Sequence, residues 1–382
     1  MKRVYLDNAA TTPLDPAVIA EMTNVMENYF GNPSAIHALG REVRTLVEKA
    51  RKTVAGLLGA SPSEIFFTSG GTEADNTAIR CGISAYGIKH AITSKIEHHA
   101  VEHTLNMMLK DGQIDKLSFV NIDGKGNIDY AHLEELLQNN ERTFVSLMHA
   151  NNELGTLTDM QKVGDICEKY NAIYHADTVQ TMGHYPHNVR ELKAHFIVCA
   201  AHKLHGPKGV GFLYVNSDIK IPPMIYGGAQ ERNMRGGTEN VYGIVGLAKA
   251  LEMAYADMDA HQTHIQGLKD YLKEQLIAEI PGIAFNGETD ADKSLYTVLN
   301  VSFPEMDMAD MLLFNLDING ICASGGSACS SGSNIGSHVL NGIQADPNRP
   351  SVRFSFSKYT TKEDLDYVIE KVKMVVKQNA LA

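Results

Sequence analysis

Apolar and polar residues alternate in two distinct patterns along most of this chain. Short apolar runs predict buried strands, whereas apolar residues spaced three and four positions apart predict helices. The predicted strands are 65–68, 91–93, 117–120, 144–149, 172–175, 196–199 and 210–215. The first predicted helix runs from Val43 to Leu58 and ends at Gly59, and a second one begins near Thr72. Three more are predicted at 101–109, 130–138 and 160–170. Because strands and helices alternate, we expect an α/β fold with a mainly parallel sheet of the seven-stranded type.

The last third of the chain has a different pattern. A long helical pattern from Asn240 to about Leu276 precedes the rest. After it come strand 297–301, helix 309–316, a loop, strand 351–357 and a helix from Lys362, an order typical of an α+β unit. We therefore predict a large domain over 14–260 and a small domain formed by 1–13 and 261–382, which carries a loop at about 323–336.

Composition narrows the class of protein. The chain has 382 residues, of which 44% are apolar and 21% charged, as in an ordinary globular protein. A net charge of −11 argues against nucleic-acid binding. No stretch approaches the roughly 18 apolar residues of a membrane helix, and the first residues lack the apolar core of a secretory signal. Five cysteines without a C-x-x-C spacing indicate a reducing cytoplasm rather than a disulfide framework.

Polar side chains gather directly after the predicted strands. The clusters are Ser69-Gly70-Gly71-Thr72, Glu97-His98-His99, Asn151-Asn152, Asp177 with Gln180, and His202-Lys203. In an open parallel sheet, ligands bind beyond the carboxyl ends of the strands. One such coincidence carries little weight, but five of them predict a single site at that edge.

Three of these clusters match the needs of a pyridoxal phosphate (PLP) site. Lys203 follows an apolar strand, and a desolvated lysine more readily becomes the neutral amine that attacks a carbonyl. Gly71 and Thr72 open a helix whose free N–H groups favour phosphate. Asp177 is placed to hold a protonated ring nitrogen. Taken singly, each has an ordinary alternative: a solvated lysine, a glycine turn with a threonine cap, and an aspartate N-cap.

Two further residues fit the same reading. A metal site at His98, His99 and His103 lacks a defined third ligand and an H-E-x-x-H motif, so a His98 ring lying against a flat cofactor is the favoured interpretation. Arg353 is the cation on the polar face of a half-buried strand. Its guanidinium suits the α-carboxylate of an amino acid, although a plain surface arginine is the alternative.

Cys329 lies in SGGSACSSGSNIG, a stretch almost without apolar side chains. Free cysteines are usually buried, so we expect this one to be exposed, as a thiol that travels between two sites would be. An accidental loop cysteine is the alternative. Cys81, Cys167 and Cys199 fall in helix or strand patterns and are predicted to be core residues, and Cys322 ranks behind Cys329.

Taken together, the motifs resemble one family over nearly the whole chain. They are YLDNAATTP, GNPSAIH, FTSGGTEADN, the Glu97-His98 pair, NNELG, HADTVQ, AHKLHGPKG, RGGTEN, GSACSSGS and the Arg353 strand. In this order they resemble the group I (NifS/IscS-type) cysteine desulfurases, class V aminotransferases of PLP fold type I. The resemblance implies an enzyme that converts L-cysteine to L-alanine and keeps the sulfur on a cysteine as a persulfide. An obligate homodimer and an acceptor such as an iron–sulfur scaffold are also implied.

The resemblance assigns a role to each candidate residue. It implies Lys203 as the Schiff-base lysine, Asp177 as the ring-nitrogen partner, His98 on the ring, Asn152 and Gln180 at the ring oxygen and the substrate, Gly71, Thr72 and His202 at the phosphate, Thr238 at the partner subunit's phosphate, Arg353 at the substrate carboxylate and Cys329 as sulfur acceptor. No resident metal is implied, although Cys329 could contact an iron–sulfur cluster transiently.

Two departures from the family pattern stand out. Relatives usually have a phosphate-binding serine two or three residues before the lysine, where this chain has Ala200 and Ala201. The last residues, KQNALA, are shorter than the tail that docks a scaffold in some relatives. The stretch NIGSHVL after Cys329 is not shortened, which favours the mobile-loop group. The alternatives are a selenocysteine lyase, another PLP lyase or aminotransferase, and a non-enzymatic scaffold.

Overall fold

A seven-stranded sheet forms the centre of the larger part of the molecule, in the order β2-β8-β7-β6-β5-β3-β4. The computed structural model describes residues 2–138, 142–306, 309–325 and 336–378. The strands are β2 Ile65–Thr68, β3 His90–Thr93, β4 Lys116–Phe119, β5 Phe144–Ser146, β6 Ile173–Asp177, β7 Phe196–Ala200 and β8 Gly211–Val215. Strand β8 pairs antiparallel with both neighbours, and all other pairs are parallel. The prediction of a mainly parallel sheet is confirmed.

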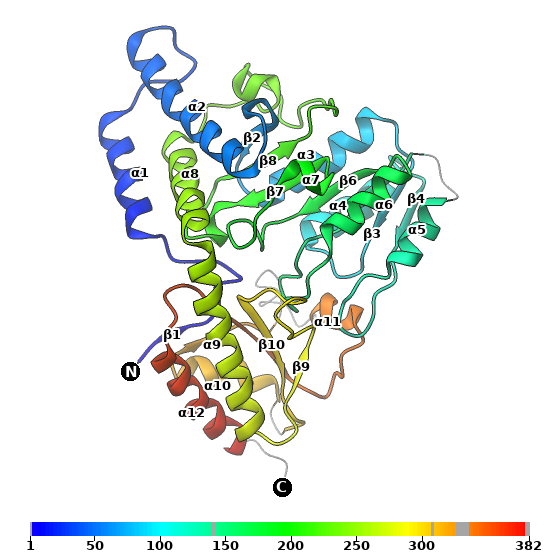
Figure 1. Ribbon diagram of the computed structural model, residues 1–382, viewed down its shortest axis with the longest axis vertical. Coiled ribbons are helices and arrows are strands. Elements are labelled where there is room, and N and C mark those ends of the chain that lie inside the picture. Colours follow the sequence, from blue (N-terminus) through cyan, green and yellow to red (C-terminus); the bar gives the residue numbers. More distant parts are fainter. Residues whose placement is uncertain (1, 139–141, 307–308, 326–335, 379–382) are drawn as a thin grey trace.

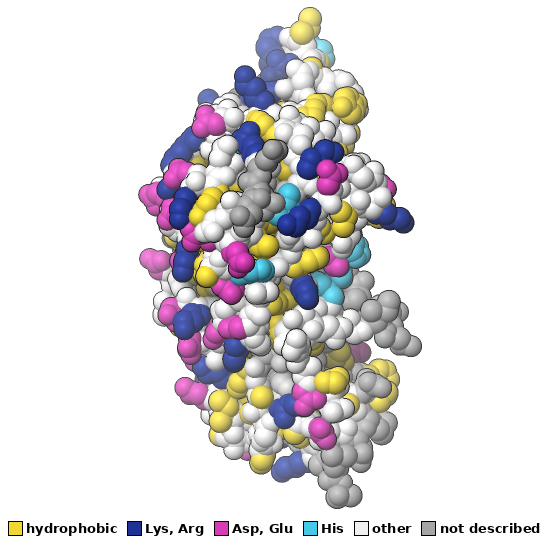
Figure 2. Space-filling model, turned by 90° about the vertical axis from the view of Figure 1, so that its right-hand side faces the viewer, with side chains coloured by type: hydrophobic (Ala, Val, Ile, Leu, Met, Phe, Trp, Pro, Cys, Tyr) yellow, Lys and Arg dark blue, Asp and Glu magenta, His cyan; other side chains and the backbone are white. Residues whose placement is uncertain are grey.

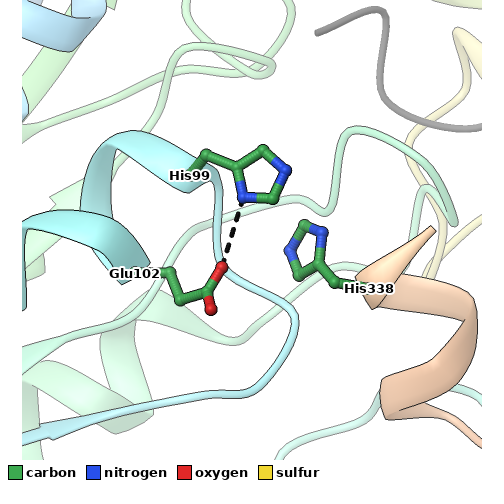
Figure 3. Close-up of side chains that lie close together, drawn as sticks. All are labelled: His99, Glu102 and His338. Atoms are coloured by element: carbon green, nitrogen blue, oxygen red, sulfur yellow. Dashed lines mark hydrogen bonds and ion pairs between the residues drawn. The ribbon is translucent and has the colours of Figure 1, made fainter. Parts of the chain in front are cut away.

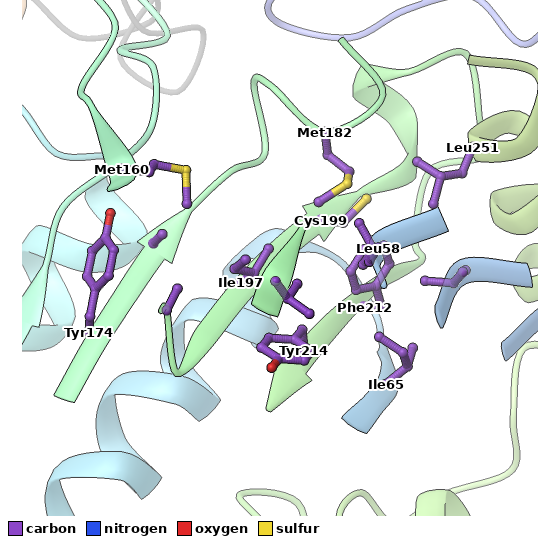
Figure 4. Close-up of a cluster of buried hydrophobic side chains, with 14 of the residues drawn as sticks. Leu58, Ile65, Met160, Tyr174, Met182, Ile197, Cys199, Phe212, Tyr214 and Leu251 are labelled. Carbon is purple, nitrogen blue, oxygen red and sulfur yellow. The ribbon is translucent and has the colours of Figure 1, made fainter. Parts of the chain in front are cut away.

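Both faces of this sheet are covered over its central strands, which explains why most strands are buried apolar runs, whereas the edge strand β4, KLSF, is only partly buried. Side chains alternate between two cores along each strand. In β7, Ile197 and Cys199 join the core under α2, α5, α6 and α8, whereas Phe196 and Val198 join the core under α3 and α4. The helices are α2 Ala38–Leu58, α3 Gly71–Ala85, α4 His99–Lys110, α5 Tyr130–Gln138, α6 Met160–Lys169, α7 Val189–Leu192 and α8 Val241–Ala256. Figure 4 shows side chains from β2, β6, β7 and β8 meeting side chains from α2, α6 and α8 in the first of the two cores.

The helix boundaries confirm one stop signal and correct the prediction in two places. Gly59, expected to end α2, lies in the left-handed region with φ of 66°. Helix α1, Pro16–Asn28, was not predicted, because only Val18 and Val25 in it are buried. The single long helix expected from Asn240 is wrong. It is divided at Asp257, whose φ of −111° is not helical, into α8 and α9 Met258–Glu279.

The smaller part has its own apolar core around a three-stranded antiparallel sheet of β9 Ala284–Asn286, β10 Val298–Ser302 and β12 Ser351–Ser355. Helices α9, α10 Leu312–Ile318 and α12 Lys362–Gln378 contribute to this core (Figure 1). Strand β1 Val4–Tyr5 pairs in parallel with β11 Ile321–Cys322 and adds Val4 to the core. The two parts have separate cores, which agrees with a large domain over 14–260 and a small domain formed by 1–13 and 261–382. The exact division stays a prediction.

The segment that follows β1 connects the two parts. The side chain of Asn8 donates to the Ser355 carbonyl at 2.8 Å, and the Thr12 N–H donates to the His202 carbonyl at 2.9 Å. Residues 8–12 therefore pass between β12 and the end of β7. Acidic and basic side chains are interspersed over the face shown in Figure 2. None of the described helices combines the length and apolar character that crossing a bilayer requires.

Candidate active site

The carboxyl ends of the central strands meet residues 8–12 and β12 around one cavity of about 210 Å³. Nine of the residues singled out from the sequence line it: Gly71, Thr72, His98, Asn152, Asp177, Gln180, His202, Lys203 and Arg353. The clusters converge because parallel strands bring their carboxyl ends to the same edge of a sheet. The structure thus brings these residues together around one cavity, and their roles there stay a prediction.

Lys203 ends the short 3₁₀ turn Ala201–Lys203 that follows β7. Its Nζ donates to the carbonyl oxygens of Ala9 and Ala10, the latter at 2.9 Å. Gln180 also donates to the Ala9 carbonyl, at 3.1 Å. The N-terminal segment therefore fixes the position of the lysine amine inside the cavity.

Asp177 is the last residue of β6, and its Oδ1 accepts a hydrogen bond from the Val179 N–H at 2.9 Å. Burial raises the pKa of Asp177, while the positive charge of Lys203 opposes that rise. Asp75 is buried and also lines the cavity, and burial together with the charges of Asp177 and Glu97 raises the pKa of Asp75 well above its usual range. A protonated ring nitrogen beside Asp177 would favour its ionised form.

His98 is the N-cap of α4, and its Nδ1 accepts from the Ala100 N–H at 3.1 Å. An N–H can only donate, so the neutral ring carries its own proton on Nε2. Burial lowers the pKa of His98, which keeps the imidazole neutral. The helix start therefore fixes both the tautomer and the position of this ring at the cavity wall.

Backbone N–H groups suited to an anion lie where β2 leads into α3. A Cβ added to Gly71 would come within 2.8 Å of Val179 Cγ2, so this position is too close for a larger residue. A recess beside the cavity is lined by Gly71, Thr72 and His202, among others. Free N–H groups at the start of this 15-residue helix favour a phosphate there.

Arg353 lies in β12 with only 1% of its surface exposed, so it is not a surface arginine. Its Nη1 donates to the Asn152 carbonyl at 2.9 Å and its Nη2 donates to Asp7 Oδ1 at 2.8 Å. Its buried Nε has no hydrogen-bond partner among the described residues. Sequence reasoning did not single out Asp7 or Asp75, although both lie in quoted motifs, YLDNAATTP and TSGGTEADN.

Thr238 does not line this cavity and instead lines a separate recess with Ser69 and Arg235. Cys329 lies outside the described residues. Cys81, Cys167 and Cys199 are buried, as predicted for core residues, and Cys322 is half-buried.

The family description "aminotransferase class-V" matches residues 4–368. The chain belongs to this family. The cysteine desulfurase IscS of Dictyoglomus turgidum is 42% identical to it, over 99% of this chain and 96% of the relative. A solved structure titled NifS-like protein superposes with a TM-score of 0.91 at 36% identity, covering 99% of this chain and 100% of the other. A structure titled SspA in complex with cysteine superposes with a TM-score of 0.80 at 30% identity, covering 94% of this chain and 100% of the other.

Class-V aminotransferases and cysteine desulfurases depend on PLP in general, and this α/β fold is that of PLP fold type I. The residues of the cavity fit that group. A buried carboxylate with a raised pKa faces it, a lysine amine is fixed within it, and a Cβ would fill the turn at Gly71. The candidate active site therefore combines a lysine amine, a buried carboxyl group and a tight glycine turn, which are compatible with PLP.

Proposed function

We propose that this protein is a cysteine desulfurase that converts L-cysteine to L-alanine and holds the sulfur as a persulfide on Cys329. The observation that carries the proposal is the convergence of Lys203, Asp177 and Gly71 on one cavity, in a chain whose relative is named cysteine desulfurase. The persulfide would supply iron–sulfur cluster assembly or another sulfur-donor pathway.

The cavity residues have distinct roles in holding PLP. Lys203 would bind its aldehyde carbon, Asp177 its ring nitrogen, Asn152 and Gln180 its ring oxygen and the substrate side, Gly71, Thr72 and His202 its phosphate, and His98 would lie against the ring. Thr238, outside this cavity, would serve the phosphate of a second subunit. When bound, PLP supplies an electron sink that stabilises negative charge on the substrate α-carbon.

Lys203 is the residue placed to move the α-proton. A neutral Nζ can accept that proton. The Ala9 and Ala10 carbonyls accept hydrogen bonds from this nitrogen and would stabilise the ammonium that forms. The N-terminal segment therefore acts as the orienting group for the base.

Arg353 would bind the substrate α-carboxylate. Its Nε is buried without a described partner, and it lines the cavity, so a carboxylate there would meet an unused donor. Asp7 and the Asn152 carbonyl fix the guanidinium plane from the other side. This arrangement selects an amino acid with a free carboxylate.

The sulfur step rests on the sequence around Cys329. The Cys329 thiolate would attack the substrate sulfur and form an S–S bond while the substrate C–S bond breaks. The electron pair of the C–S bond and a proton end on carbon, which gives alanine. The proposal also includes a sulfur-acceptor protein and a homodimer. It includes a cytoplasmic location as well, because the chain has few cysteines and no disulfide framework is expected.

The test is a visible spectrum of the purified protein with PLP, followed by L-cysteine and a thiol reductant. The proposal requires an absorption band from lysine-bound PLP that is lost in Lys203→Ala, and release of alanine and sulfide. In Cys329→Ser, the band should remain and sulfur transfer should stop. Unaltered turnover in Cys329→Ser, or turnover of selenocysteine alone, would favour another lyase or aminotransferase. A protein that never binds PLP would be a scaffold.

A further inference from the structure

Three potential metal ligands meet on the surface beside the cavity (Figure 3). His99 is the first residue of α4, Glu102 lies one turn along the same helix, and His338 is the first residue of α11 His338–Gly342. His99 Nδ1 lies 3.2 Å from Glu102 Oε2, and the rings of His99 and His338 have centroids 4.3 Å apart. One ligand atom from each residue lies within 4.8 Å of the other two.

The tautomer of His338 suits metal binding. Its Nε2 lies 2.9 Å from the backbone carbonyl oxygen of Glu97. A carbonyl oxygen only accepts, so Nε2 carries the proton and Nδ1 keeps its lone pair. Metal-bound histidines typically donate their second ring nitrogen to a carbonyl or carboxylate in this way. The Glu97 carbonyl therefore fixes the tautomer of His338 and leaves the lone pair of Nδ1 available to a metal ion.

Charge and access are also favourable. Two imidazoles and one carboxylate form a set that divalent transition metals such as zinc accept, with water in the remaining position. The side chains of His99 and Glu102 are 25% and 28% exposed, so an ion and a water can reach them. The positive end of the α4 dipole opposes a cation, but the Glu102 carboxylate places a full negative charge within the set.

The distances require only side-chain adjustment. Ligand atoms around tetrahedral zinc lie about 3.3–3.6 Å apart when each is about 2.0–2.2 Å from the metal. The 3.2 Å between His99 Nδ1 and Glu102 Oε2 is already close to this range.

From these observations, we infer that His99, Glu102 and His338 bind a divalent transition metal ion, and that the bound ion joins α4 to α11. Neither element alone supplies the set, because His338 comes from the part of the chain after residue 335. The histidines near His98 lacked a third ligand in the sequence, and the fold supplies it.

Zinc(II) is the probe that tests this site. The full-length, PLP-loaded protein would carry Cys329→Ser in every sample, because a thiolate is itself a zinc ligand. Competition with a chromophoric chelator should give one zinc per chain. His99→Gln, Glu102→Gln and His338→Gln should each weaken binding by at least about tenfold. His103→Gln is the matched control on the same helix and should change affinity by less than about threefold.

A second readout tests the link between the helices. Zinc should slow amide hydrogen exchange in α11 of the parent protein and have no such effect in His338→Gln. The inference fails if the parent binds no zinc at micromolar concentration, if the three ligand variants bind as the parent does, or if His103→Gln loses binding as fully as His338→Gln. Binding without any change of exchange in α11 would also overturn the proposed link.

Discussion

The Asp7 carboxylate accepts a hydrogen bond from Arg353 Nη2 at 2.8 Å, although the two residues are 346 positions apart. Arg353 is buried, so this carboxylate balances a guanidinium that is removed from water. Asp7 also accepts from the Ser324 hydroxyl at 2.8 Å. The first residues of the chain thus balance the charge of the proposed substrate-binding arginine.

Asp7→Asn should lower the free energy of unfolding by about 1–3 kcal/mol, because it leaves a buried positive charge beside a neutral amide. Urea unfolding at neutral pH would measure the change. Asp111→Asn, at an exposed position, is the matched control and should stay within about 0.5 kcal/mol of the parent. Equal stability of the two variants would show that Arg353 does not depend on this partner.

Arg353→Lys should raise the KM for L-cysteine by about tenfold or more, with a smaller effect on kcat. Lysine keeps the charge but loses the planar fork that binds a carboxylate through two hydrogen bonds. Steady-state kinetics of alanine formation would measure both constants. The visible band of bound PLP serves as the control, because Arg353 has no proposed contact with the cofactor. A fall in kcat alone would contradict substrate-carboxylate binding.

Gly71→Ala should weaken PLP retention by at least about tenfold, because the new Cβ would meet Val179 Cγ2 at 2.8 Å at the proposed phosphate turn. Equilibrium dialysis against PLP would measure it. Gly56→Ala in α2 is the control. Nothing lies within 4 Å of that Cβ, so this variant should bind PLP normally and gain up to about 1 kcal/mol of stability.

Ala200→Ser should strengthen PLP retention several-fold. Ala200 lines the cavity, so a hydroxyl there could donate to the phosphate. Ala201→Ser is the matched comparison, because Ala201 is fully buried in the large core and a hydroxyl there would be destabilising. Slower loss of PLP on dilution of Ala200→Ser alone is the expected result. A gain in Ala201→Ser would place the phosphate elsewhere.

The buried amine of Lys269 should make the free energy of unfolding increase as the pH rises above neutrality. Its side chain is buried in α9, where Nζ donates to the Ser294 hydroxyl and to the Leu295 carbonyl, and burial lowers the pKa of Lys269 to about 7. The unfolded chain keeps a pKa near 10.4 and so binds more protons between the two values. The penalty for burying the charge is full below about pH 7 and is relieved as pH rises towards 10.4.

Lys269→Met should remove that part of the pH dependence. Chemical unfolding at several pH values from 7 to 10 would give the slope for both proteins. Lys273→Met, on the same helix and only half-buried, is the control and should keep the slope of the parent. A parent whose stability falls over this range, with a slope that Lys269→Met does not alter, would contradict the lowered pKa.

Most strands were predictable because both faces of the sheet are covered, so all but the edge strand β4 are largely buried. Helix α1 was not, because two buried valines are too few for a clear pattern. The cavity could be predicted from strand ends, since parallel strands share an edge. In contrast, the partners Asp7 of Arg353 and His338 of His99 come from remote segments, and only the fold brings them together. Asp257 interrupts an apolar pattern that otherwise continues, so the pattern gave no sign of the break.

The pairing of residues 4–8 has a consequence for synthesis of the protein on the ribosome. Strand β1 emerges first, yet its partner β11 and the Ser355 carbonyl that binds Asn8 are made near the end, 347 positions later in the second case. At about 5–20 residues per second, the N-terminal segment waits roughly 20–70 s for these partners. The contacts of the Ala9 and Ala10 carbonyls with Lys203 need only the first 203 residues. The anchoring of the same segment to β11 and Ser355 must wait until nearly the whole chain has been translated.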